Sequence, residues 1–169
     1  MGSRIVKLLI VCFAFFSNNV WAQTSVDEAQ AIFIYNFLSH TLWPETVSNN
    51  TIEIGVYGET NTYKTLCDYT QNRKVGTKSI AVKKLNSINE AVNCNVILIA
   101  YNSSNQMSQI NEKLKNKPCL VITEKAGTTN LGAIIEFTLV NDKLKYRANQ
   151  ENAIDHNLYL SAALLKMSL

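Results

Sequence analysis

The sequence is short of glycine, proline and charge. Its 169 residues include 6 glycines and 2 prolines, and 17% are charged, which excludes collagenous, low-complexity and disordered chains. A nucleic-acid partner is not indicated, because the net charge is only +3 and no run of lysine or arginine exceeds two residues. The 47% hydrophobic content is enough for one folded domain with a buried core.

Motifs for nucleotide binding and catalysis are also missing. A dinucleotide-binding G-x-G-x-x-G would follow the first strand, where only Gly58 occurs, and the phosphate-binding G-x-x-x-x-G-K-[ST] pattern is absent. The segment 127–132 favours a flexible bridge over an anion site. His40 and His156 are interpreted as structural or solvated. We therefore expect no catalytic residue, no metal site and no cofactor.

The first 22 residues have the features of a secretory signal peptide. Arg4 and Lys7 precede the apolar run 8–16, and Val20-Trp21-Ala22 ends in a small residue. The apolar run is about half of the roughly 20 residues that a membrane-spanning helix needs. We expect cleavage near Ala22, export of the chain, and a single mature domain over residues 23–169.

Export would place Cys67, Cys94 and Cys119 in an oxidising compartment, where at most one disulfide can form among the three. The helix after the first strand returns toward the edge where the later parallel strands begin, which would bring all three cysteines there. A bridge from Cys94 to Cys119 would join neighbouring strands and is strained. We predict a Cys67–Cys94 disulfide with Cys119 as a buried thiol. The alternative, in which all three stay reduced, remains open.

Apolar patterning predicts alternating helices and strands. An opening helix is expected over residues 26–42, because Pro44 follows it closely. The middle of the chain then alternates as right-handed βαβ units do, which favours a parallel sheet. Strands are predicted at 51–57, 79–82, 96–100 and 120–122, with helical segments at 60–72, 88–92 and 107–114 between them.

The end of the chain predicts a β-hairpin and a closing helix. Strands 133–139 and 144–148 are separated by a turn-forming segment, and a helix is expected from Gln150 onward. Along the second strand, three basic residues alternate with apolar ones and would form an exposed row: Lys143, Lys145 and Arg147. The fold class is therefore α/β, with a mostly parallel sheet flanked by helices, a C-terminal hairpin and a closing helix.

Several segments resemble the YfiR family of periplasmic proteins. Residues 31–37, Ala-Ile-Phe-Ile-Tyr-Asn-Phe, followed by Trp43-Pro44, look like that family's opening helix. Residues 132–137, 143–149 and 158–165 are similar to its hairpin and closing helix in order and spacing. Two positions differ from the family: Arg147 stands where a carboxylate is frequent, and Ala148 where a larger apolar residue is usual.

The resemblance implies a non-catalytic periplasmic regulator. Such a protein represses a membrane-bound diguanylate cyclase by contacting its periplasmic part, which lowers cyclic-di-GMP and restrains biofilm formation. A homodimer is an additional partner option. Two other classes stay open: a small-ligand receptor that binds at the carboxyl ends of the parallel strands, and a hydrolase with an unusual site. The candidate partner-binding residues are Tyr35, Trp43, Pro44, Lys143, Lys145 and Arg147.

Overall fold

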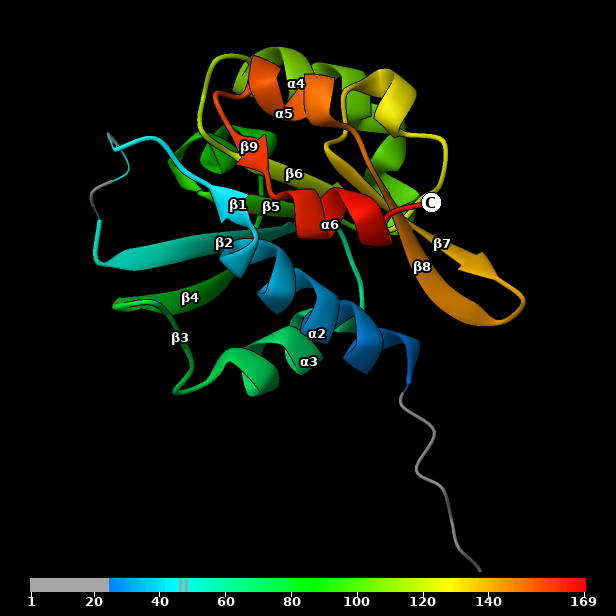
Figure 1. The fold of residues 1–169 in the computed structure, drawn as a ribbon, viewed down its shortest axis with the longest axis horizontal. Helices are drawn as coiled ribbons and strands as arrows, with labels where there is room; N and C mark the ends of the chain where they lie inside the picture. The colour runs from blue at the N-terminus through cyan, green and yellow to red at the C-terminus, as the bar shows by residue number, and fades with distance from the viewer. Residues whose placement is uncertain (1–24, 46, 48) are drawn as a thin grey trace, which may run out of the picture.

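A computed structural model describes residues 25–45, 47 and 49–169. The predicted signal peptide, residues 1–22, lies outside these residues. Within them the chain folds into a mixed α/β domain whose helices cover both faces of one central sheet (Figure 1). No helix in this part of the chain is long and apolar enough to cross a membrane.

The central sheet has seven strands in the order β3-β4-β2-β5-β6-β7-β8. The five strands from β4 to β7 run parallel, whereas β3 and β8 pair antiparallel at the two edges. The sheet is therefore mixed, and the prediction of a mostly parallel sheet is confirmed in part. The strands are β2 (Thr51–Tyr57), β3 (Lys74–Val75), β4 (Lys78–Leu85), β5 (Val96–Ile99), β6 (Leu120–Thr123), β7 (Ile135–Val140) and β8 (Lys143–Ala148).

Helices lie on both sides of this sheet. Helices α2 and α3 pack against each other on one side, and α4 and α5 lie together on the other (Figure 1). The buried strands β5 and β6 are apolar or uncharged throughout, as expected for a sheet covered on both faces. The helices are α2 (Val26–Ser39), α3 (Thr62–Thr70), α4 (Met107–Leu114), α5 (Gln150–Asp155) and α6 (Ala162–Met167), with 3-10 turns η1 (Ile88–Asn93), η2 (Tyr101–Gln106) and η3 (Thr129–Leu131).

The order of the parallel strands creates a switch point in the sheet. The chain crosses in one direction from β2 to β4 and in the opposite direction from β4 to β5. Because both crossovers are right-handed units, α3 and η1 lie on opposite faces of the sheet. The chain segments that leave β2 and β5 at their carboxyl ends therefore diverge. Open α/β sheets bind ligands at such a point.

Four aromatic side chains attach α2 to the β7–β8 hairpin, and we call them the aromatic cluster: Phe33, Phe37, Phe137 and Tyr146. The ring of Phe37 meets Tyr146 edge-on at 4.8 Å and stacks on Phe137 at 6.0 Å, and Phe33 lies 5.5 Å from Tyr146. The hydroxyl of Tyr146 donates to the Leu164 carbonyl at 2.7 Å, which adds α6 to the same packing unit. Helix α2 is thus held in place by the β7–β8 hairpin.

The opening helix is shorter than predicted. It ends at Ser39, and residues 41–42 form β1 (Thr41–Leu42), which pairs antiparallel with β9 (Tyr159–Leu160). The Thr41 hydroxyl donates to the Phe37 carbonyl at 2.8 Å, and the Ser161 N–H donates to the His40 carbonyl at 2.9 Å. The predicted end at Leu42 is wrong because these groups satisfy the end of the helix and a distant segment pairs with the chain beyond it.

The single closing helix predicted from Gln150 is also wrong, because the structure divides it into α5 and α6. After α5 ends at Asp155, Asn157 adopts the left-handed conformation with φ of 55°. Asparagine tolerates this conformation and commonly ends a helix in this way. Its Nδ2 also donates to the Asn116 carbonyl at 3.0 Å, which fixes the turn that leads into β9.

The structure does not contain the predicted Cys67–Cys94 bridge, since Cys67, Cys94 and Cys119 are all free thiols. Cys67 belongs to α3, whereas Cys94 follows η1, and a β-carbon on Gly55 would lie 2.7 Å from its Sγ. The sheet separates the two cysteines because α3 and η1 lie on opposite faces. Burial raises the pKa of both Cys94 and Cys119, which keeps these thiols protonated and weakly reactive.

The aromatic cluster predicts a clear difference between two positions on α2. Phe37→Ala should lower the free energy of unfolding by about 3–5 kcal/mol, because the ring is 2% exposed and its removal leaves a cavity. Ile32→Ala on the same helix, where the side chain is 36% exposed, should cost less than about 1 kcal/mol. Urea denaturation followed by circular dichroism measures both. Equal losses would contradict the cluster as the anchor of α2.

Candidate functional site

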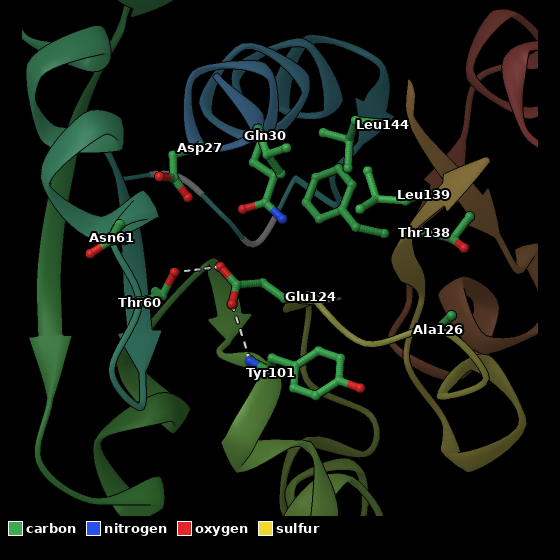
Figure 2. A pocket seen from close by; sticks show the side chains of 12 residues that line it. Asp27, Gln30, Thr60, Asn61, Tyr101, Glu124, Ala126, Thr138, Leu139 and Leu144 are labelled. Carbon is green, nitrogen blue, oxygen red and sulfur yellow. Dashed lines mark hydrogen bonds between the residues drawn. The ribbon is translucent and has the colours of Figure 1, made fainter. Parts of the chain in front are cut away.

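A pocket lies at the carboxyl ends of β2, β5 and β6, and we call it the edge pocket (Figure 2). Its volume is about 450 Å³, within the range of roughly 300–1,000 Å³ that small-molecule sites occupy. The walls come from the start of α2, the loops that follow the three strands, and the β7–β8 hairpin. The edge pocket therefore lies at the switch point of the sheet, where the strand order places a ligand site.

Glu124, the first residue after β6, connects the loops of the edge pocket. Its Oε1 accepts a hydrogen bond from the Thr60 hydroxyl at 2.6 Å, and its Oε2 accepts one from the Tyr101 N–H at 3.1 Å (Figure 2). Thr60 follows β2 and Tyr101 follows β5, so one carboxylate holds the ends of three parallel strands in place. In the described residues Glu124 forms no ion pair.

The start of α2 supplies a second polar group, because Gln30 is only 6% exposed and borders the pocket. The Thr62 hydroxyl lies between the Gln30 Oε1 and the Asp27 Oδ1, the second contact being 3.3 Å long. One end of the Gln30 amide is held in this way. Figure 2 shows the other end, Nε2, directed into the pocket, where no described residue forms a hydrogen bond with it.

The hairpin side of the edge pocket is apolar. Phe137, Leu139 and Leu144 line it, and Leu139 faces Leu144 directly across the two strands. Leu139 is 57% exposed, so this wall is accessible to solvent. Lysine, arginine and histidine do not occur among the described residues that line the pocket. The site therefore combines carboxylates and an amide with an apolar wall, which suits ligand binding.

The sequence analysis did not single out Gln30 or Glu124. Glu124 carries a usable signal, because it directly follows an apolar strand and so belongs to the carboxyl edge of a parallel sheet. Gln30 carries none, since its position over that edge depends on how α2 packs. The ligand-receptor alternative did predict a site at this edge, and the edge pocket lies there.

Tyr35, a predicted partner-binding residue, is engaged in contacts within the chain. Its hydroxyl donates to the Lys74 carbonyl at 2.9 Å, and its ring meets Tyr69 edge-on at 5.8 Å. The guanidinium of Arg73 lies 5.6 Å from the Tyr35 ring and 4.2 Å from the Tyr69 ring. Tyr35 therefore attaches α2 to the β3 edge of the sheet.

Trp43 and Pro44 follow β1 and are partly buried. Trp43 packs against the core, and its buried Nε1 has no hydrogen-bond partner among the described residues. The neighbouring pair Leu42 and Tyr159 is more accessible, with 64% and 56% exposure, and the two residues lie opposite each other in the β1–β9 pairing. We call this two-stranded element the β1–β9 ribbon. It presents two large apolar side chains side by side.

The predicted basic row is exposed as expected, because Lys143, Lys145 and Arg147 all lie on the outer face of β8. Arg147 differs from the two lysines: its Nε is 3.8 Å from Oε1 of Glu136, whose side chain is 5% exposed. Glu136 also accepts the Thr129 N–H at 2.8 Å. The segment 127–132 therefore directs an amide toward a carboxylate of the chain itself, consistent with its interpretation as a bridge.

The structure does not gather the six predicted partner-binding residues into one surface. Tyr35 lies beside β3 at one edge of the sheet, whereas the basic row lies on β8 at the other, six inter-strand spacings of about 4.8 Å away. Trp43 and Pro44 directly follow strand β1 of the β1–β9 ribbon. The part of the chain that the structure describes also holds no group of three or more histidine, cysteine or acidic residues close enough to bind a metal.

The fold is a mixed α/β domain with a pocket at the carboxyl ends of its parallel strands. Its elements from α2 to α6 match the order in which the YfiR-like segments occur in the sequence. The chain belongs to the YfiR/HmsC-like family, whose sequence model matches residues 27–168, and this confirms the resemblance. No curated protein matches the chain. The family suggests a regulator of diguanylate cyclase signalling.

Neither histidine lies in the edge pocket, and His156 is completely buried. Its Nδ1 lies 3.3 Å from the Lys117 carbonyl and its Nε2 3.0 Å from Oδ1 of Asn111 on α4. Burial lowers the pKa of His156 below its usual value of 6.5, and the Lys117 carbonyl and Asp155 oppose this shift only in part. The imidazole is therefore a neutral structural group, in agreement with the structural interpretation from the sequence.

This burial predicts a pH dependence of stability. Because the pKa of His156 is lower in the folded chain than in the unfolded chain, the unfolded chain takes up the proton first as the pH falls. Stability should be unaffected above about pH 6.5 and should decrease below it until the folded pKa is reached. Melting temperatures should therefore fall less from pH 7 to pH 5 in His156→Gln than in the unmodified protein or in His40→Gln. Equal decreases in all three proteins would contradict this assignment.

Proposed function

We propose that the protein is an exported, non-catalytic regulator that represses a membrane-bound diguanylate cyclase by contacting its periplasmic part. Repression lowers cyclic-di-GMP and restrains biofilm formation. The observation that carries the proposal is the family match over residues 27–168, which spans the described domain from α2 to α6. The signal-peptide pattern of residues 1–22 supports export to the periplasm.

The contact with the cyclase is proposed at the β1–β9 ribbon. Leu42 and Tyr159 are both more than half exposed and lie opposite each other, and Trp43-Pro44 directly follows Leu42. Adjacent exposed apolar side chains commonly mark protein-binding surfaces, and tyrosine and tryptophan are enriched among the residues that dominate binding energy. The predicted candidates Trp43 and Pro44 would then support the surface from its partly buried side.

The basic row supplies a second, electrostatic contribution. Lys143 and Lys145 are exposed and form no ion pair in the described part of the chain. Charges at the rim of an interface mainly raise the association rate and make binding sensitive to salt. Arg147 has less freedom for this purpose, because it lies close to the buried carboxylate of Glu136.

Loss of the protein should raise cyclic-di-GMP and surface attachment. Deleting its gene removes the repressor, so the nucleotide level should rise in a strain shown to express the cognate cyclase. Expression of the protein from a plasmid should restore the original level. Quantification of cyclic-di-GMP by mass spectrometry, with attachment measured in parallel, tests the proposal. Unchanged nucleotide levels in the deletion strain would contradict repression.

The ribbon predicts which substitutions separate binding from folding. Leu42→Ser combined with Tyr159→Ser should weaken binding to the purified periplasmic part of the cyclase by at least about tenfold, because it removes exposed apolar contacts. Ile154→Ser is the matched control, since Ile154 is 48% exposed on α5. Biolayer interferometry measures binding, and melting temperatures verify folding. An unchanged affinity in the double variant would exclude the ribbon as the surface that binds the cyclase. The variant with Lys143→Glu and Lys145→Glu, measured in the same assay at low salt, tests the contribution of the basic row to binding.

A further inference from the structure

We propose that the edge pocket binds a small organic amine that carries an ammonium group, an aromatic or aliphatic body and a hydroxyl group. This assignment goes beyond the proposed function, which names no ligand. It rests on three independent features of the pocket: its charge, an amide whose free end faces into the pocket, and an apolar wall that is open to solvent.

The negative charge of the edge pocket favours a ligand with a cationic group. Asp27 and Glu124 both line it, and neither forms an ion pair in the described residues. Glu124 accepts one hydrogen bond at each oxygen, which leaves capacity for a further donor, because a carboxylate offers about four acceptor positions. An ammonium group would form charge-assisted hydrogen bonds with these oxygens, which are stronger than neutral ones.

The Gln30 amide favours a ligand with a hydroxyl group. The side chain is 6% exposed, and Thr62 holds only one end of its amide. The other end points into the pocket without a partner in the described residues (Figure 2). This end of the amide is accessible from the pocket, so a polar group of a bound ligand can form a hydrogen bond with it. A hydroxyl both donates and accepts, and therefore satisfies whichever end of the amide faces it.

The apolar wall determines the body of the ligand and excludes amino acids. Phe137, Leu139 and Leu144 offer a surface on which a ring or alkyl chain would remove apolar area from water. A free amino acid would add its own carboxylate beside Asp27 and Glu124, in a pocket whose described lining contains no basic residue. Such a charge would be repelled by the two carboxylates that line the pocket. The preferred ligand is therefore an amine without a carboxylate.

Three matched probes test this assignment with the purified protein. Tyramine has the ammonium group, ring and hydroxyl; 4-ethylphenol lacks the ammonium group; tyrosine adds a carboxylate. Tyramine should show saturable binding by isothermal titration and should raise the melting temperature. The other two compounds should bind at least about tenfold more weakly. Absence of saturable tyramine binding, or equal binding of all three, would overturn the proposal.

Substitutions in the pocket identify the groups responsible. Glu124→Gln and Gln30→Met should each weaken tyramine binding by about tenfold, and Glu112→Gln, an exposed position on α4, should leave it unchanged. Asp27→Asn is the second charge variant, at a partly buried position in the first turn of α2. Unchanged binding in all three pocket variants would overturn the assignment. No cyclase is needed, so failure here leaves the repression proposal untouched.

Discussion

The packing of α2 on the β7–β8 hairpin is the interaction on which the rest of the structure depends. Phe33 and Phe37 of α2 pack against Phe137 and Tyr146 of the β7–β8 hairpin. The same helix carries the edge pocket at its first turn and leads into the β1–β9 ribbon after its last turn. A displacement of α2 along the hairpin would therefore alter the pocket and the ribbon together, and so would connect the proposed ligand site to the proposed partner surface.

The parallel strands could be predicted because their signal is local. The unbroken apolar run at residues 96–100 predicts a strand buried on both faces of the sheet, and the structure has the buried strand β5 at residues 96–99. The C-terminal end of α2 and the division of the closing helix depend on contacts with residues far away in the sequence. Thr41 pairs with Leu160, and Asn157 bonds to Asn116, so neither break follows from the periodicity of the surrounding residues. Asn157 was nonetheless a recognisable stop signal of its own.

The candidate sites divide in the same way. The rule that open α/β sheets bind ligands at the carboxyl ends of their strands leads to this edge, and the edge pocket occurs there. Gln30, however, reaches it only because the aromatic cluster fixes α2 above the strands. The alternation of basic and apolar residues along β8 correctly predicted that the basic row is exposed. It could not predict that Glu136 lies close to Arg147. The Cys67–Cys94 pairing failed in the structure because it treated the cysteines as neighbours along an edge, when the sheet lies between them.

The β1–β9 ribbon also has a consequence for how the chain folds. The hydrogen bond between His40 and Ser161 joins residues that are 121 positions apart in the sequence, so the pairing of β1 with β9 is a long-range contact. It cannot form until nearly the whole polypeptide has been synthesised, and loop-closure entropy makes it a late event. A chain that ends prematurely before Tyr159 would leave the residues after α2 without their partner strand. Such truncated chains would stay incompletely folded and accessible to proteases, which confines the ribbon to full-length molecules.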